Sequence, residues 1–224
     1  MTQANELLQF PLFSSLSEED LAPLLPYVRE RRYRKGQVLF VEGEIGKNVY
    51  FVLSGQVKLT KNLPDGEEQI LDWCGPYDSF AEELLIESGP YTTTAEIIQE
   101  STLLVLDNKA VPDIIESSPI IALALIRTLS KRLRLAQEFI RIMSSRSTAG
   151  ILAALLLRLA NPGNKPGQPI YVDANLTHRD LANMIGTSRE CVNRAINSWK
   201  RAAILSVNED RLEILKPQEL ADWP

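Results

Sequence analysis

Residues 176–201 read LTHRDLANMIGTSRECVNRAINSWKR, and this stretch predicts two short helices joined by a glycine turn. Thr177 and Asp180 have the spacing of a capping box at the start of the first helix. Gly186 ends that helix, and Ser188 is typical of the cap that begins the second. Two helices joined in this way form a helix-turn-helix, whose second helix enters the major groove of DNA. We therefore expect this segment to bind double-stranded DNA.

The second of these predicted helices separates an apolar face from a polar face. Arginine can bond guanine O6 and N7 with both arms of its fork, and glutamate can accept a hydrogen bond from cytosine N4. The apolar face is predicted to comprise Val192, Ile196 and Trp199. The residues expected to read bases are Arg189, Glu190, Asn193 and Arg194. The residues expected to contact phosphates are Thr177, His178, Arg179, Ser188, Lys200 and Arg201. An amphipathic pair of helices with solvated charges is the alternative.

The chain continues the same pattern on both sides of this segment. Residues 204–207 and 211–215 read as the two strands of a β-hairpin, which would be the wing of a winged helix. Residues 148–160 read as a further helix, and Asn161-Pro162-Gly163 would end it. We place a domain boundary near Ser144–Ser147, where small hydroxyl residues gather.

A long helix is predicted upstream, because no Gly or Pro interrupts the chain between Pro119 and Gly150. Apolar residues recur along it at alternating spacings of four and three, which is typical of a coiled-coil seam and predicts a parallel homodimer. The residues expected to form the dimer seam are Ala122, Ile126, Leu129, Leu133, Ala136, Ile140 and Met143. A second apolar stripe is available to pack inward, and it comprises Ile121, Leu125, Leu135, Phe139 and Ile142. Packing on its own domain alone is the alternative for this helix.

The first half of the chain is predicted to be mostly β-structure. Residues 12–29 read as a helix, with Ser17 and Asp20 as a capping box. From residue 33 to residue 106, short β-type runs are separated by turn residues, among them Ser54-Gly55 and the hairpin turn Pro64-Asp65-Gly66. Many short strands without long helices indicate a sandwich or barrel, so strands followed by helices make the fold class α+β.

Charge is distributed unevenly over the 224 residues, whose net charge is −5. Residues 1–126 carry a net charge of −11, residues 127–146 carry +5, and residues 147–224 carry +1. DNA responds to the local field of one face because distant charges are screened. The acidic total therefore does not exclude a nucleic-acid ligand.

Composition excludes several other classes. Two cysteines, Cys74 and Cys191, are too few for a disulfide scaffold or a zinc cluster, and the single His178 excludes sites that need two histidines. The apolar runs are too short to span a membrane, and residues 1–9 do not resemble a signal peptide, so we expect a cytoplasmic protein. A nucleophile–base pair and a Gly-rich phosphate loop are not evident, so we do not expect an enzyme.

Several motifs give the chain a resemblance to the Crp/Fnr family of bacterial transcription regulators. They are Leu12-Phe13-Ser14-Ser15-Leu16-Ser17-Glu18-Glu19, Lys35-Gly36 with Glu42-Gly43-Glu44, Val52-Leu53-Ser54-Gly55, and Ile185-Gly186-Thr187-Ser188-Arg189-Glu190 through Arg194. The resemblance implies an effector-sensing β-roll of the cyclic-nucleotide-binding type over residues 1–117. A dimerisation helix and hinge (118–146) and a winged-helix DNA-binding domain (147–224) would follow. It also implies an inverted repeat of TGTGA-like half-sites read by Arg189, Glu190 and Arg194, and RNA polymerase as a partner.

The same comparison indicates that the effector is not cyclic AMP. Where the cyclic-AMP-binding branch resembles Gly-Glu-Leu and Arg-Ser-Ala, this chain has Ala81-Glu82-Glu83 and Thr93-Thr94-Ala95, so Thr93 replaces the phosphate-neutralising arginine. Ala136-Gln137 replaces the Thr-Ser pair that would meet adenine. The N-terminal cysteines of an iron–sulfur site are absent. A haem held by Cys74 stays open as an alternative.

Residues 79–83 and 90–95 resemble the nitric-oxide-responsive branch of the family, which suggests where an unidentified small effector binds. The expected pocket lies between the β-roll and the dimer helix, and ligand binding there would rotate the recognition helices. Its residues are Phe80, Ala81, Glu82, Glu83, Leu85, Thr93, Thr94, Leu129, Leu133, Ala136 and Gln137. A constitutive regulator that needs no effector is the other alternative.

Overall fold

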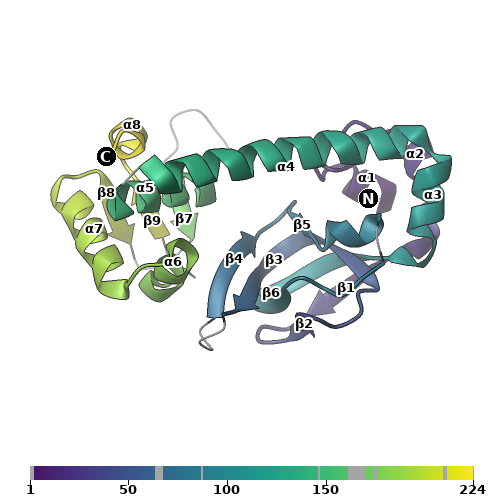
Figure 1. The fold of residues 1–224 in the computed structure, drawn as a ribbon, viewed down its shortest axis with the longest axis horizontal. Coiled ribbons are helices and arrows are strands. Elements are labelled where there is room, and N and C mark those ends of the chain that lie inside the picture. The colour runs from purple at the N-terminus through teal and green to yellow at the C-terminus, as the bar shows by residue number, and fades with distance from the viewer. Residues whose placement is uncertain are drawn as a thin grey trace. The chain divides into compact units, whose positions relative to one another are not determined.

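The computed structural model describes residues 3–63, 68–86, 88–145, 147–160, 170–173, 176–208 and 211–223. They belong to two compact units, Met1–Leu133 and Arg134–Pro224. The predicted turn Pro64-Asp65-Gly66 and the predicted helix end Asn161-Pro162-Gly163 lie outside the described residues. The strands gather in the first part of the chain and helices dominate the second, so the α+β class is confirmed (Figure 1).

The N-terminal unit is built on one antiparallel sheet with the strand order β1-β6-β3-β4. Two short strands lie off this path, since β2 pairs with β6 and β5 pairs with β3. The strands are β1 (Val28–Tyr33), β2 (Val38–Phe40), β3 (Asn48–Asn62), β4 (Glu68–Cys74), β5 (Ser79–Phe80) and β6 (Thr94–Asp107). The expectation that short strands dominate the first half of the chain is confirmed, and these strands form a single sheet.

The two longest strands contain a bulge where the sequence predicted a turn. Ser54-Gly55 lies inside β3, which continues past it, so the turn prediction is wrong. The register between β3 and β6 shifts on both sides of Gly55, whose φ is +91°. A Cβ at this position would lie 2.5 Å from the carbonyl oxygen of Glu100. Glycine therefore bends the strand where any side chain would collide with β6.

The predicted helix over residues 12–29 is also wrong. The structure has α1 (Gln3–Leu7), α2 (Glu18–Leu21) and a 3₁₀ turn, η1 (Leu25–Tyr27), before β1 begins at Val28. The capping box at Ser17 is confirmed, since its hydroxyl accepts from the backbone N–H of Asp20 at 3.2 Å. The helix ends after one turn because Pro23 and Pro26 cannot continue its hydrogen bonds.

One hydrophobic core fills the N-terminal unit. Phe51 of β3 contacts Phe10 and Phe13, with ring centroids 5.1 and 5.3 Å apart. The same core includes Ile121 and Leu125 from the first turns of the long helix. The other short elements of the N-terminal unit are η2 (Glu82–Leu85), η3 (Asn108–Ala110) and α3 (Val111–Ser117).

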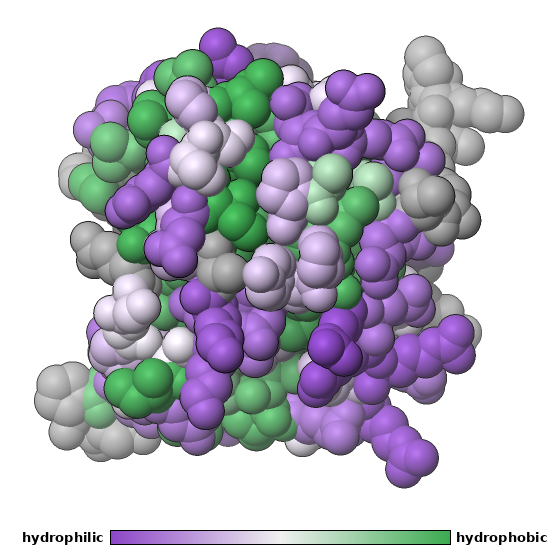
Figure 2. Space-filling view, turned by 90° about the vertical axis from the view of Figure 1, so that its right-hand side faces the viewer, coloured by the Kyte–Doolittle hydropathy of each residue, from purple (hydrophilic) through white to green (hydrophobic). Residues whose placement is uncertain are grey.

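Figure 2 shows one face of the molecule, on which hydrophilic and hydrophobic residues are mixed.

The long helix is confirmed as α4 (Pro119–Ser145), and its seam is exposed from Ile126 to Ile140, whereas Ala122 is half exposed. Ile126, Leu133 and Ile140 expose 60, 60 and 63% of their surface. The inward stripe is confirmed only at its start, because Ile121 and Leu125 are buried whereas Leu135 is 62% exposed. The side chains of Phe139, Ile142 and Met143 lie outside the described residues. In one chain, therefore, the seam has no cover.

The C-terminal unit combines helices with a three-stranded sheet of order β7-β9-β8. The predicted hairpin is confirmed as β8 (Leu205–Asn208) and β9 (Arg211–Ile214), and β7 (Ile170–Asp173) was not predicted. The helices are α5 (Thr148–Leu159), α6 (His178–Ile185), α7 (Arg189–Arg201) and α8 (Pro217–Ala221). Trp199 is fully buried and packs edge-on against Trp223, with ring centroids 5.7 Å apart.

Candidate nucleic-acid interface

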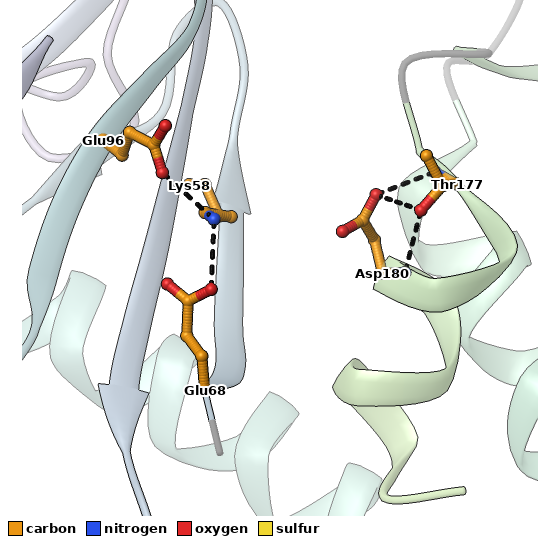
Figure 3. Close-up of polar contacts among 5 residues, drawn as sticks. All are labelled: Lys58, Glu68, Glu96, Thr177 and Asp180. Atoms are coloured by element: carbon orange, nitrogen blue, oxygen red, sulfur yellow. Dashed lines mark hydrogen bonds and ion pairs between the residues drawn. The ribbon is translucent and has the colours of Figure 1, made fainter. Parts of the chain in front are cut away.

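The first helix of the predicted helix-turn-helix starts with a complete capping box. Thr177 Oγ1 accepts from the backbone N–H of Asp180 at 3.1 Å, and Asp180 Oδ2 accepts from the N–H of Thr177 at 2.8 Å (Figure 3). Such a cap contributes about 1 kcal/mol by pairing helix N–H groups that otherwise have no partner. The start of α6 is thus fixed by two residues that the sequence singled out.

The turn and the second helix also form as predicted. Gly186 ends α6 in the left-handed conformation, with φ +67°. Ser188 caps α7 by accepting from the N–H of Cys191 at 3.3 Å. Because glycine adopts positive φ without strain, the chain can turn within three residues and present α7 at a fixed angle.

Helix α7 has one buried face and one exposed face. Val192, Ile196 and Trp199 are buried, as predicted. The residues expected to read bases are all exposed, and the structure brings them together on the first two turns: Arg189, Glu190, Asn193 and Arg194. Their side chains are not all extended, because Arg194 Nη2 donates to Cys191 Sγ at 3.0 Å and Asn193 Oδ1 accepts from Asn197 at 3.1 Å.

The charges of these side chains suit contact with DNA. The pKa of Glu190 lies below its usual range because its own backbone N–H and the Ser188 hydroxyl stabilise the carboxylate, as do Arg189 and Arg194. Burial lowers the pKa of His178, and the positive charges of Arg189 and Lys200 lower it further. Glu190 is therefore an acceptor at neutral pH, and His178 lies in a positive field.

The residues expected to contact phosphates lie at the ends of both helices. Thr177 and Ser188 use their hydroxyls as caps, and His178 is only half exposed. The exposed cations of this set are Arg179, Lys200 and Arg201. All of these residues belong to α6, α7 or their caps.

A cavity beside α7 was not predicted. It has a volume of about 460 Å³, and its lining includes Ser147, Thr148 and Ala149 from the start of α5 together with Cys191 and Arg194 of α7. Cys191 is half exposed in this lining. Its pKa is lowered by hydrogen bonds from Ser188 and Thr187 and by Arg194. In the sequence analysis Ser147 marked only a domain boundary, and nothing indicated that α5 begins next to α7.

The expected effector residues of the β-roll are largely packed. Phe80, Ala81 and Leu85 belong to the hydrophobic core. Glu82 is 8% exposed, whereas Glu83 is exposed and accepts from Thr92 Oγ1 at 3.2 Å. Of the remaining positions, Thr93 and Thr94 are half exposed, and Leu129, Leu133, Ala136 and Gln137 are exposed on α4.

One hydrogen bond and one buried thiol complete this part of the β-roll. Thr94 Oγ1 accepts from the backbone N–H of Glu42 at 3.0 Å, which ties β6 to the end of β2. Cys74 is 3% exposed and lies in the core. Among the residues that the structure describes, no group of three His, Cys, Asp or Glu side chains could hold a metal ion. Within the same ranges, no helix is long and apolar enough to cross a membrane.

Comparison with known proteins matches both units to families. Residues 30–118 match the cyclic nucleotide-binding domain, and residues 152–223 match the Crp-like helix-turn-helix domain. A CRP-like cAMP-activated global transcriptional regulator of Mycobacterium tuberculosis is 32% identical over 211 residues, which cover 94% of each chain. The cyclic AMP receptor protein of Thermus thermophilus is 29% identical over 204 residues, which cover 91% of this chain and 92% of the relative.

Solved structures share the fold. The structure of FixK2 from Bradyrhizobium japonicum superposes with a TM-score of 0.74 at 23% identity, covering 86% of this chain and 95% of that one. A CRP/FNR-family transcriptional regulator from Thermus thermophilus gives 0.66 at 24% identity, covering 87 and 98%. The two domain matches, in this order and over nearly the full shared length, show that the chain belongs to the Crp/Fnr family of DNA-binding transcription regulators.

Proposed function

We propose that this regulator reads an inverted-repeat operator as a homodimer, with α7 of each subunit in one major groove. The observation that carries the proposal is the exposure of Arg189, Glu190, Asn193 and Arg194 on two successive turns of a helix whose opposite face is buried. Such a helix can contact base edges in the major groove while its opposite face stays packed on the rest of the domain. By the family resemblance, each half-site is TGTGA-like.

The apolar seam of α4 supports the dimer. Ile126, Leu133 and Ile140 lie on one helix face and are each at least 60% exposed, and Leu129 between them is 41% exposed. A row of large apolar side chains at coiled-coil spacing is stable in water when a second copy covers it. The seam thus supports dimerisation through residues 118–146. By the family resemblance, residues 1–117 sense an effector and residues 147–224 bind DNA. Contact with RNA polymerase follows from the same resemblance.

The start of α5 adds a phosphate contact to this interface. Thr148 and Ala149, at the positive end of the α5 helix dipole, line the same cavity as Arg194. A backbone phosphate seated against Thr148 and Ala149 would meet helix N–H groups and a cation at once. This contact fixes the position of α7 on the duplex without reading sequence.

The charges of the β-roll support the exclusion of cyclic AMP as the effector. Residues 62–108 contain eleven Asp or Glu and no Lys or Arg. Two cations of β3 are already paired: Lys58 lies 3.3 Å from Glu68 and 3.1 Å from Glu96 (Figure 3), and Lys61 lies 3.3 Å from Glu42. A cyclic phosphate would enter beside Glu82 and Glu83 without a cation, which is costly in a partly buried site. This argument supports an effector other than cyclic AMP.

Calorimetry with cyclic AMP tests this part of the proposal. We expect no binding heat at millimolar nucleotide, because Thr93 supplies no positive charge. Thr93→Arg adds the missing cation, and it should bind cyclic AMP measurably if the site is otherwise intact. Micromolar binding by the unmodified protein would overturn the exclusion.

The effector itself is sought by gel shift with the purified protein, with and without a low-molecular-weight fraction of a cell extract. Binding that needs the fraction supports an effector, which mass spectrometry of the co-purified molecules then identifies. Full binding by the pure protein would favour the constitutive regulator instead. A haem held by Cys74 has little support, because that thiol lies in the packed core, and an absorption spectrum without a Soret band would exclude it.

Selection from random duplexes tests the operator. The recovered sequences should contain two TGTGA-like half-sites in inverted orientation, about one helical turn apart between centres. Enrichment of a single half-site or of direct repeats would contradict the symmetric dimer, and no enrichment would contradict sequence reading by α7.

A further inference from the structure

The cavity beside α7 has an apolar wall. Leu152, Val192 and Trp199 belong to its lining, and each is at most 1% exposed. Trp223, which packs edge-on against Trp199, lines the cavity as well. The volume of about 460 Å³ is typical of pockets that hold small organic molecules between apolar walls and a few polar groups. A DNA phosphate is small and polar, so it would leave this wall uncovered.

The charge of the cavity is positive. Among the described residues that line it, Arg194 is the only charged one. Thr148 and Ala149 lie in the first turn of α5, where the helix dipole is positive and the N–H groups have no acceptor inside the helix. Ser147 Oγ already accepts from the N–H of Gly150 at 3.2 Å, so the cap uses one donor of this turn. A negatively charged group is the complement of this part of the lining.

A buried donor belongs to the same lining. The indole Nε1 of Trp199 is withdrawn from water and has no hydrogen-bond partner among the residues that the structure describes. Burial of an N–H group without an acceptor costs free energy. An oxygen atom of a bound molecule would supply the acceptor if it reached this group. The lining therefore suits a molecule that carries acceptor oxygens and a negative charge on an apolar body.

The guanidinium of Arg194 is held one helical turn back along α7. Its Nη2 donates to Cys191 Sγ at 3.0 Å, and both residues line the cavity. An anion that pairs with Arg194 in this position would stabilise it there. The guanidinium would then be kept from the base edges that it is expected to read.

We propose that this cavity binds a small organic anion, whose acidic group pairs with Arg194 and whose flat apolar body lies against Val192 and Trp199. The anion takes the seat of the proposed operator phosphate and holds Arg194, so its binding releases DNA. It is a second effector site, in the C-terminal unit, beside the one expected in the β-roll. Binding of the anion depends on the cavity alone, whereas its effect on DNA rests on the function proposed above.

The probe that tests the site is 2-naphthoate, which joins one carboxylate to a flat apolar body. Isothermal calorimetry with the full-length protein should show one molecule per chain, with a dissociation constant of about 10⁻⁴ M or tighter. The neutral analogue 2-naphthamide has the same shape and should bind at least about tenfold more weakly, because it lacks the charge. Equal affinity for the two probes, or no binding of 2-naphthoate, would overturn the proposal.

Variants locate the bound probe. Arg194→Met removes the charge but keeps an extended side chain, so it should weaken 2-naphthoate at least about tenfold and leave 2-naphthamide unchanged. Arg158→Met is the matched control, since Arg158 is an exposed arginine in the last turn of α5, outside the described lining. Ala195→Phe should fill the cavity and abolish binding of both probes, whereas Asn197→Phe on the exposed side of α7 should not.

Equal melting temperatures show that these variants fold. Unchanged binding of 2-naphthoate by Arg194→Met and by Ala195→Phe would place the probe elsewhere and overturn the assignment. Equal losses for Arg194→Met and Arg158→Met would overturn it too, because net charge alone would then explain them.

The thiol of Cys191 gives a second measurement that does not involve DNA. Cys191 is half exposed, and Ser188, Thr187 and Arg194 lower its pKa, whereas Cys74 is 3% exposed. Iodoacetamide should therefore modify Cys191 first, as mass spectrometry can show. At ten times its dissociation constant, 2-naphthoate should slow this reaction about tenfold by covering the thiol. An unchanged rate would contradict a probe that lies beside Cys191.

DNA binding separates this inference from the function proposed above. Fluorescence anisotropy with a TGTGA inverted-repeat duplex should show at least about tenfold weaker binding at the same concentration of 2-naphthoate, and no change with 2-naphthamide. Operator binding that 2-naphthoate leaves unchanged would overturn the release of DNA and leave the proposed function standing. Failure to bind any duplex, with 2-naphthoate bound as expected, would overturn the proposed function but not the anion site.

Discussion

Arg189 lies in the first turn of α7, exposed and on the face opposite the core. If its fork bonds one guanine, Arg189→Ala should remove the preference at one base pair of each half-site, worth about 1–3 kcal/mol there. Competition binding with operators changed at single positions measures this. Arg201→Ala, at the end of the same helix, should weaken binding to all these duplexes alike. Preserved selectivity in Arg189→Ala would refute the assignment.

His178 gives DNA binding a pH dependence of known sign. In the free protein its pKa is lowered from about 6.5 by burial and by the charges of Arg189 and Lys200. A DNA phosphate near the start of α6 would counter these charges and raise the pKa. The complex would then bind more protons than the free protein, so affinity should rise as pH falls from 8 to 6. His178→Gln should flatten this profile in anisotropy titrations, and an unchanged profile would contradict the placement.

Single residues were predicted best where one side chain satisfies a local need. The caps at Ser17, Thr177 and Ser188 and the turn at Gly186 depend only on neighbours within four residues, and all four are confirmed. The contact between Arg211 and Tyr171 was not predicted, because the two residues lie forty positions apart in the chain. A contact of that kind requires knowledge of the sheet register.

Among the elements, β3 owes its bulge to Gly55. Gly55→Ala should cost the β-roll both the strain of a positive φ and a collision with β6, about 1–3 kcal/mol beyond strain alone. Gly36→Ala is the matched control, since Gly36 has φ +82° but nothing within 4 Å of an added Cβ. Urea denaturation measures both. Equal losses of unfolding free energy would show that the close approach to β6 does not matter.

The seam of α4 makes a second prediction at this scale. Leu133→Asp places a charge in the middle of the proposed dimer interface and should shift the protein to monomers, with operator binding reduced at least tenfold. Leu135→Asp is the matched control, because Leu135 is equally exposed but lies about 160° away around the helix. Sedimentation velocity measures the oligomer. Dimers in both variants would place the interface elsewhere.

Helices and strands were predicted well where a single apolar face sets the spacing of the hydrophobic residues. α4 and the helix-turn-helix carry clear apolar faces, and both are confirmed. β1 was missed because it is an edge strand whose residues Arg29–Arg32 are exposed on both faces, which leaves no alternation to detect. The helix predicted over residues 12–29 is wrong because the prediction followed the apolar spacing of Leu24 and Leu25. Pro23 and Pro26 interrupt a helix at this point.

At the scale of the whole molecule, the sequence predicted the two parts and their order, which the structure confirms as a β-domain followed by a helix-turn-helix. Local charge was more informative about DNA binding than net charge. The total of −5 combines a β-roll that is acidic throughout residues 62–108 with a C-terminal part that is not. In a single chain the seam of α4 appears only as a row of exposed apolar side chains. The dimer, and with it the operator, is therefore tested by measurement.

The most direct measurement of the central claim compares two duplexes with the same half-sites. One carries TGTGA and its inverted copy at one-turn spacing, and the other has the half-sites moved apart by about five base pairs, which turns one to the opposite side of the helix. We predict two chains per duplex on the first, with a Kd of about 10⁻⁸ M or tighter at physiological salt, and binding at least about 10³-fold weaker on the second. Equal binding to both duplexes, or one chain per duplex, would contradict a symmetric dimer that reads DNA through paired α7 helices.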